Sequence, residues 1–189
     1  MRAANHLGLL AAIAVPVLCV FCLLLHGAAA SAAQALCRDA WDALLPHALG
    51  AGEHTIAERI GNPDARAYDV LLDADVAAYR LSGEAAAPRE GRVYYRNGIA
   101  VAVATIYDNE RSGGLLPRFL LEHADEILDY GDRSAVAGLR ENCDVYTVLS
   151  VGDRESGVYI LNAAFYRKMA ALGDLPSLPP DHGRKGHAA

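Results

Sequence analysis

The sequence predicts an α+β domain, in which an antiparallel sheet built from hairpins has helices packed on one face and contains one disulfide. Two hairpin patterns support the sheet, one centred near residue 97 and one between residues 144 and 162. Helical periodicity occurs in blocks before, between and after these hairpins. Strands that come as hairpins, with helices grouped around them, favour an antiparallel α+β domain over a doubly wound parallel sheet.

Residues 1–33 have the layout of a secretory signal peptide. Arg2 is the only charged residue among them, the stretch Leu7–Leu25 is almost wholly apolar, and small residues follow it up to Ala33. A positive start, an apolar middle and a small-residue exit are typical of a cleaved leader. Pro16 interrupts the apolar stretch and also favours cleavage. The stretch is long enough to span a bilayer, so an uncleaved leader that anchors the domain to the inner membrane is the alternative.

Composition and charge narrow the class of protein. The chain has 17 basic and 23 acidic residues, a net charge of −6, and loss of Arg2 with the leader makes it −7. A mildly acidic domain excludes a general nucleic-acid binder, which needs a basic face, and excludes electrostatic binding to anionic lipid. The alanine- and arginine-rich composition is typical of a GC-rich bacterium. The sequence therefore predicts a periplasmic or secreted bacterial protein without a cofactor, and its oligomeric state stays open.

Two of the four cysteines are expected to stay in the mature chain. Cys19 and Cys22 leave with the leader, whereas Cys37 and Cys143 remain. A pair of cysteines in an oxidising compartment normally forms a disulfide. We expect a Cys37–Cys143 bridge that ties the first helix to the start of the last hairpin.

The first half of the domain is expected to contain helices and then strands. A helix is predicted over 35–49, with its regular part either ending or bending near Leu45 because Pro46 cannot donate a helical hydrogen bond. A short helical turn is predicted over 55–60. Residues 66–81 alternate and predict one long strand, or two strands with a bend. Asn97-Gly98 predicts a tight hairpin turn, in a register that pairs Arg96 with Ile99, Tyr95 with Ala100 and Tyr94 with Val101.

The second half is expected to be richer in helix. Apolar spacing from Pro117 to Leu128 predicts a helix capped by Gly131, and a short helix is predicted over 134–140. A hairpin over 144–150 and 158–162 and a helix over 163–172 follow. These elements make residues 34–174 one globular domain, and the proline-rich residues 175–189 are expected to be a disordered tail. The sequence shows no internal repeat.

Two polar loops are the candidate interaction surfaces, because exposed loops on a rigid sheet often hold recognition residues. The first loop contributes Asp108, Asn109, Glu110, Arg111 and Ser112, and the second contributes Asp153, Arg154 and Glu155. If both lie at the same end of the sheet, they form one composite binding edge. Five tyrosines, at positions 94, 95, 107, 146 and 159, divide between the core and possible contact surfaces.

An enzyme is the alternative interpretation. His54 and His123 would have to meet the strand carboxylates Asp69, Asp73 and Asp75 in one cleft to serve a hydrolase or a metal site. Helical spacing also places His54 near Glu58 and His123 near Glu126. A solvated strand face is the favoured explanation of the three aspartates, so no catalytic or metal-binding residue is assigned.

The sequence therefore favours an exported, non-enzymatic binding protein whose partner is another exported protein. An inhibitor or immunity-type protein that caps a toxin or a cell-wall enzyme suits its size, acidity and location. The alternative is a small envelope hydrolase or metal-dependent enzyme that uses His54 or His123 with the strand carboxylates.

Overall fold

A computed structural model describes residues 35–82, 88–108, 114–138 and 145–178, and the chain separates at Gln34 into two units. All that follows concerns the second unit. The predicted leader lies outside the described residues. The elements of this unit, in chain order, are β1 (Leu36–Cys37), α2 (Arg38–Ala48), α3 (Glu53–Ile60), β2 (Ala65–Asp69), β3 (Ala74–Ser82), β4 (Glu90–Arg96), β5 (Ile99–Asp108), α5 (Leu115–Glu122), β6 (Ile127–Tyr130), β7 (Ser134–Gly138), β8 (Val145–Val151), β9 (Glu155–Asn162) and α6 (Ala163–Leu172).

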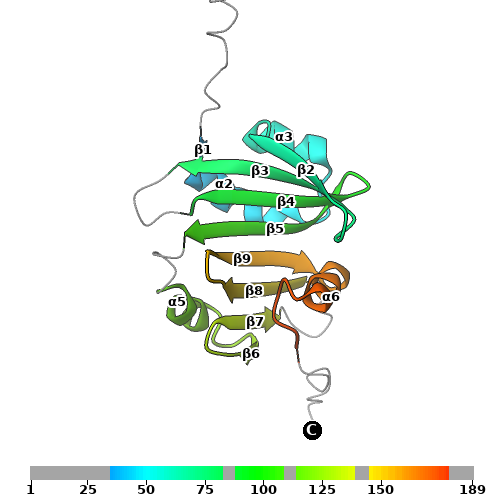
Figure 1. Ribbon diagram of the computed structural model, residues 1–189. Coiled ribbons are helices and arrows are strands. Elements are labelled where there is room, and N and C mark those ends of the chain that lie inside the picture. The colour runs from blue at the N-terminus through cyan, green and yellow to red at the C-terminus, as the bar shows by residue number, and fades with distance from the viewer. Residues whose placement is uncertain (1–34, 83–87, 109–113, 139–144, 179–189) are drawn as a thin grey trace, which may run out of the picture. The chain divides into compact units, whose positions relative to one another are not determined.

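The strands form one nine-stranded sheet that is almost wholly antiparallel, as the sequence predicts (Figure 1). Its order is β1-β3-β4-β5-β9-β8-β7-β6, and β2 pairs with β3 beside β1. Only the two-residue strand β1 is parallel to its neighbour, with Leu36 opposite Leu81 and Cys37 opposite Ser82. The α+β class is therefore confirmed.

The sheet has a two-fold repeated topology that the sequence does not show. A helix followed by four antiparallel strands occurs twice, as α3 with β2, β3, β4 and β5, and as α5 with β6, β7, β8 and β9. The last strands of the two halves, β5 and β9, lie side by side and antiparallel, with Ala102 opposite Leu161 and Asp108 opposite Glu155. We call this central pairing the seam.

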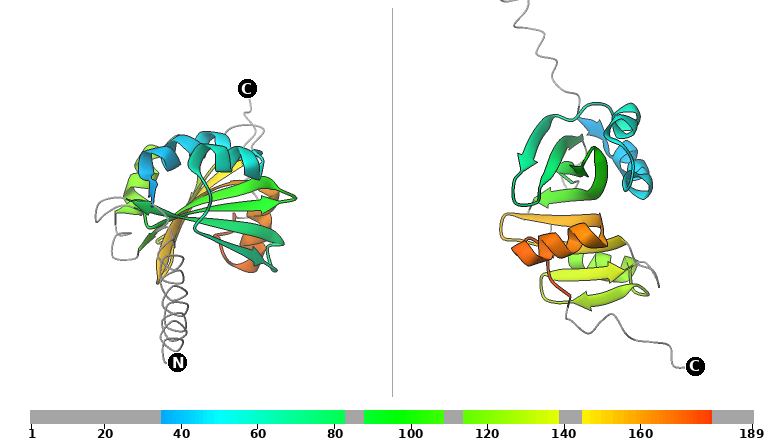
Figure 2. Two further views of the ribbon diagram at one scale, coloured as in Figure 1. Left: turned by 90° about the horizontal axis from the view of Figure 1, so that it is seen from above. Right: turned by 90° about the vertical axis from the view of Figure 1, so that its right-hand side faces the viewer.

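Helices cover both faces of the sheet, so the predicted packing on one face is wrong (Figure 2). On one face, Trp41 and Leu44 of α2 and Ile56 of α3 pack on the first half, while Phe119 of α5 packs on the second half. On the opposite face, Phe165 and other residues of α6 pack across both halves. Most strands bury side chains on both faces, which requires two covering layers.

The predicted Asn97-Gly98 hairpin is confirmed. Asn97 and Gly98 have φ angles of 52° and 74°, as a tight turn of this kind requires. Arg96 pairs with Ile99 and Tyr95 with Ala100, but a register shift then places Tyr94 opposite Ala102 instead of Val101. A bulge of this kind cannot be read from a two-residue periodicity.

Residues 66–81 form two strands, β2 and β3, which fold back on each other as a hairpin. Asp69 ends β2, and its Oδ1 accepts a hydrogen bond of 2.9 Å from the backbone N–H of Leu72. Asp73 completes the turn with a φ of 53°. The hairpin thus takes Asp69, Asp73 and Asp75 off the single strand face on which the sequence places them.

The helical predictions for 123–128 and for 134–138, the described part of 134–140, are wrong. Helix α5 ends at Glu122, where the backbone N–H of His123 bonds back to Phe119. Strands β6 and β7 follow, and β7 pairs with β8 along its whole length. Sheet pairing here overrides the helical propensity of alanine, since Ala135 and Ala137 are fully buried and leave room for Phe119.

Helix α2 continues through Pro46 to Ala48, so the helix does not end near Leu45, the first of the two predicted outcomes. Proline costs the helix only the hydrogen bond to the carbonyl of Asp42, and Asp42 is solvent-exposed. The final helix agrees with the prediction at both ends, with its N-cap Asn162 accepting a 2.8 Å bond from Phe165 N–H. Beyond it, Leu175 is buried in the core and Leu178 N–H donates to the Tyr166 hydroxyl.

The sheet register places Cys37 and the start of the strand that follows Cys143 at opposite ends of the sheet, which bears on the predicted Cys37–Cys143 bridge. Cys37 is exposed and lies opposite Ser82 at the last residue of β3, whereas Val145 lies opposite Asn162 at the other end of the sheet. Strands β4, β5 and β9 separate β3 from β8, a span of about 19 Å at the usual strand spacing, and a disulfide needs Cα atoms within about 7 Å. Cys143 lies outside the described residues, so the bridge stays a prediction, and alkylation of the unreduced protein followed by mass measurement tests it.

Candidate functional site

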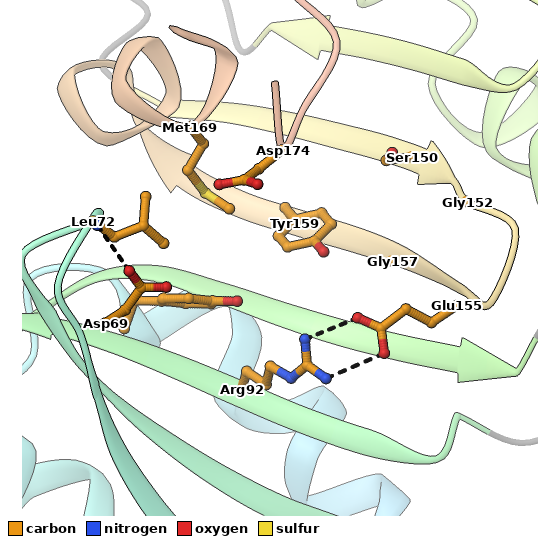
Figure 3. Close-up of a pocket in the computed structure, with 11 residues that line it drawn as sticks. Asp69, Leu72, Arg92, Ser150, Gly152, Glu155, Gly157, Tyr159, Met169 and Asp174 are labelled. Atoms are coloured by element: carbon orange, nitrogen blue, oxygen red, sulfur yellow. Dashed lines mark hydrogen bonds and ion pairs between the residues drawn. The ribbon is translucent and has the colours of Figure 1, made fainter. Parts of the chain in front are cut away.

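The best candidate site is a hollow of about 320 Å³ on the α6 face of the sheet. Figure 3 shows it between α6 and the turn that joins β2 to β3, with residues of strands β4 and β9 in its floor. The residues that line it are Asp69, Leu72, Arg92, Tyr94, Ser150, Gly152, Glu155, Gly157, Tyr159, Met169 and Asp174. The volume falls at the lower end of the usual range of ligand pockets. We call this feature the hollow.

Small residues in the floor of the sheet create the hollow. Arg92 on β4 and Tyr159 on β9 both lie opposite Ala104 of β5, which therefore separates them with only a methyl group. In the next row, Gly157 lies opposite Ile106. A Cβ at Gly157 would come within 2.6 Å of the Tyr159 ring, so the absence of a side chain there lets the ring lean over the strand.

A network of ion pairs fixes one end of the hollow across the seam. Glu155 accepts hydrogen bonds from both terminal nitrogens of Arg92, at 3.1 and 3.3 Å, and a third from Arg89 at 3.1 Å. Arg89 also binds Asp108 at 3.2 Å, and Glu90 binds Arg92. Paired contacts between a guanidinium and a carboxylate fix the geometry of both side chains. This end of the hollow, formed by Arg89, Arg92 and Glu155, is therefore rigid, and we call it the rim.

The Arg92 guanidinium remains charged at any ordinary pH. Partial burial by itself would lower its pKa, but the hydrogen bonds to Glu155 and Glu90 outweigh burial and raise the pKa above its usual value. On the other side, burial first and the neighbouring Tyr94 second raise the pKa of Tyr159, so its phenol stays neutral. The floor of the hollow thus presents a neutral phenol hydroxyl beside a charged arginine that is paired with Glu155 and Glu90.

We expect the Arg92–Glu155 pair to contribute about 1–2 kcal/mol of coupling energy to stability, because both side chains are less than half exposed and the contact has two hydrogen bonds. A double-mutant cycle with Arg92→Gln and Glu155→Gln, read by urea unfolding, measures it. The Arg133–Asp153 pair nearby is far more exposed and should give less than about 0.5 kcal/mol. Equal coupling in the two cycles would contradict the assigned role of the rim.

The structure brings the described members of the two predicted polar loops together at one end of the sheet. Asp108, the last residue of β5, lies directly opposite Glu155, the first residue of β9, and Arg89 binds both. Asp153 lies on the exposed turn before Glu155 and binds Arg133 at 2.8 Å, and Arg154 is exposed beside it. The remaining members of the first loop, Asn109, Glu110, Arg111 and Ser112, lie outside the described residues.

The residues of the predicted enzyme site do not meet in the described part of the chain. His54 on α3 pairs with Glu58 at 3.1 Å, and His123 after α5 pairs with Glu126 at 3.4 Å. Asp73 binds Tyr68 and Arg96 and, with Asp75, lines a separate depression. Asp69 alone reaches the hollow. Within residues 35–82, 88–108, 114–138 and 145–178, no group of three such side chains could hold a metal ion.

The five tyrosines singled out in the sequence are all buried or half-buried. Tyr94 and Tyr95 are buried, and Tyr107, Tyr146 and Tyr159 are half-buried. The exposed tyrosines are Tyr68 and Tyr130, on the two edge strands β2 and β6.

Sequence reasoning did not find Arg92, Met169 and Asp174 as site residues. Arg92 left a signal that could have been read: it shares a strand face with Tyr94, which is buried. A charged residue at a core position of a strand implies a buried partner. Asp174 left no such signal, because its place depends on the cap of α6, where Gly173 has a φ of 82° and Asp174 N–H bonds to the Met169 carbonyl.

Comparisons with known proteins add little to this geometry. No protein-family model matches the chain, and no curated protein matches it. Among solved structures, the chain is similar to an extracellular protein from Bacillus anthracis that contains an SCP domain, with a TM-score of 0.39 and 13% identity. The match covers 73% of this chain and 52% of that chain, about half its length. A similarity this low carries no argument, so the site is interpreted from its own geometry.

None of the helices in the described segments is both long and apolar enough to cross a bilayer.

Proposed function

We propose that this protein is an exported, non-enzymatic binding protein and that the hollow with its rim is its contact surface. The observation that carries the proposal is the Arg92–Glu155–Arg89 network, which holds a rigid polar rim beside a hollow floored by Tyr94 and Tyr159. Binding sites combine a mostly apolar concave surface with a few fixed polar groups. Rigidity before binding lowers the entropy lost on association.

The export leader predicted over residues 1–33 places this surface in the periplasm or outside the cell. Its partner would then be another exported protein. Within that class, we favour an inhibitor or immunity-type protein that caps a toxin or a cell-wall enzyme, because the mature chain is small and acidic. Acidic proteins of this kind attract basic partners and speed their association.

We expect the mature protein to retain one partner from a periplasmic extract of its own bacterium. Ser150→Arg should abolish this capture, because Ser150 lines the hollow and a long charged side chain would fill it. Thr55→Arg is the matched control, since Thr55 is exposed on α3 and the other face of the sheet. Immobilised wild type, control and variant are compared by mass spectrometry of the retained protein.

The results separate the proposals. Equal capture by the Ser150→Arg variant would show that the hollow is not the contact surface. Turnover of purified cell-wall fragments by the wild type would contradict a non-enzymatic role. Loss of the partner's own activity on addition of the wild type, in a titration with a one-to-one end point, would support the inhibitor class.

A further inference from the structure

Two carboxylates of the hollow are not part of the ion pairs at its rim. Glu155 and Glu90 form ion pairs with Arg92, and Asp108 forms one with Arg89. Asp69 accepts one backbone hydrogen bond, from Leu72. Within the residues that the structure describes, neither Asp69 nor Asp174 forms an ion pair. Two carboxylates therefore remain on the walls of the hollow with their charge uncompensated.

Backbone hydrogen bonds fix the positions of Asp69 and Asp174 in the chain. Asp69 ends β2 and closes the turn to Leu72. Asp174 follows Gly173 in a capping motif in which two backbone N–H groups bond back to α6. Lys168 of α6 donates a 2.6 Å bond to the carbonyl of Leu72 and so ties the two walls together.

Between the carboxylates, buried apolar and aromatic side chains form the base of the hollow, while most of its exposed lining is polar. Leu72 and Met169 are each 3% exposed and Tyr94 is 5% exposed. Figure 3 shows the Tyr159 ring in the middle of the hollow, below Asp174 and Met169. An aromatic face attracts a cation, and apolar walls suit the aliphatic stem of a long basic side chain.

We propose that the hollow binds a primary ammonium or guanidinium group on an aliphatic stem, as a lysine or arginine side chain of the partner protein would present it. The charged group would lie over Tyr159 between Asp69 and Asp174, and the stem would contact the Tyr159 ring and the small exposed edges of Leu72 and Met169. This inference rests on the proposed function, since it names the chemistry that the contact surface recognises. It also gives a physical reason for an acidic protein to prefer a basic partner.

The test uses Nα-acetyl-lysine methylamide as the probe and its neutral norleucine analogue as the control. Titration of the mature protein, followed by the amide resonances of Gly157 and Asp174 in NMR spectra, should give a saturable shift with the lysine probe. The norleucine analogue should bind at least tenfold more weakly. Higher salt should weaken the lysine probe alone, because partly exposed charges are screened.

Asp174→Asn and Asp69→Asn are the variants, and each should weaken the lysine probe about tenfold. Neither should disturb the fold, because the Asp174 side chain has no structural bond among the described residues and an asparagine oxygen can still accept from Leu72 N–H. Asp125→Asn is the matched control, since Asp125 is exposed beyond α5 and lines none of the described hollows. Cadaverine, a free diamine, tests the small-molecule source of the same group.

Each outcome has one meaning. Equal binding of lysine and norleucine probes, or unchanged binding in both variants, overturns the cation proposal. If these fail while Ser150→Arg still abolishes capture, the contact surface stands and only its chemistry is wrong. If the lysine probe binds as expected but Ser150→Arg captures the partner normally, the cation site stands and the proposed function fails. Cadaverine binding more than tenfold tighter than the lysine probe would assign the site to free amines instead of a protein.

Discussion

Trp41→Ala is expected to lower the free energy of unfolding by about 3–5 kcal/mol, the usual cost of truncating a large buried aromatic side chain. The Trp41 side chain is completely buried. Its ring lies over Gly91 and packs against the Tyr79 ring, with the two ring centroids 5.9 Å apart. Its Nε1 donates a 3.0 Å hydrogen bond to Thr105 Oγ1. Tyr79, Gly91 and Thr105 are neighbours in one row across β3, β4 and β5. Trp41 therefore fastens α2 to three strands at once.

Urea unfolding followed by circular dichroism measures this effect, since Trp41 is the only tryptophan and fluorescence is lost with it. Thr105→Val removes only the acceptor and should cost about 1–3 kcal/mol, because it leaves a buried N–H unsatisfied. Leu121→Ala is the control, since Leu121 is 80% exposed, and should change stability by less than about 0.5 kcal/mol. A loss below 1 kcal/mol in Trp41→Ala would contradict the position of the ring.

Gly91→Ala should destabilise the protein by about 1–3 kcal/mol, because it overpacks the same contact from the other side. A Cβ at Gly91 would lie 2.6 Å from two ring carbons of Trp41. A rigid indole between a helix and a sheet cannot rotate away, so either the helix or the strand must shift.

Gly52→Ala is the matched control for the alanine change, since a Cβ there meets nothing within 4 Å. The effects of Trp41→Ala and Gly91→Ala on the free energy of unfolding should also be strongly non-additive. In a Trp41→Ala background, Gly91→Ala should cost little, because the ring that it would strike is gone. Additive losses would show that Gly91 serves the strand alone.

The elements that the sequence predicts correctly are those encoded by local chemistry. The Asn97-Gly98 turn, the helix begun by Asn162, and the short helix before Gly61 each depend on a few adjacent residues. The sequence misleads where a distant partner decides. A helix is predicted over residues that include 134–138, in which alanine favours helix, but pairing with β8 makes these residues strand β7.

The candidate site was predictable in part for the same reason. Glu155 and Asp108 were identifiable as members of two polar loops, but their pairing depends on β5 meeting β9, which no local pattern encodes. Asp174 owes its place to a helix cap and Asp69 to a turn, and both line the same hollow only because α6 packs over the β2–β3 hairpin. Burial on both faces of the sheet likewise depends on which helix covers which half.

The seam between β5 and β9 has a consequence for the order of folding and for its control by a ligand. Within each half, neighbouring strands follow one another in sequence and close only short loops, whereas the seam joins segments far apart in the chain, a slower step. The hollow draws Arg92 from the first half and Glu155 and Tyr159 from the second, so it exists only after the halves have docked. Any ligand of the hollow would therefore stabilise the docked state by mass action, and slower hydrogen exchange at the backbone amides of the seam would report its binding before any partner is identified.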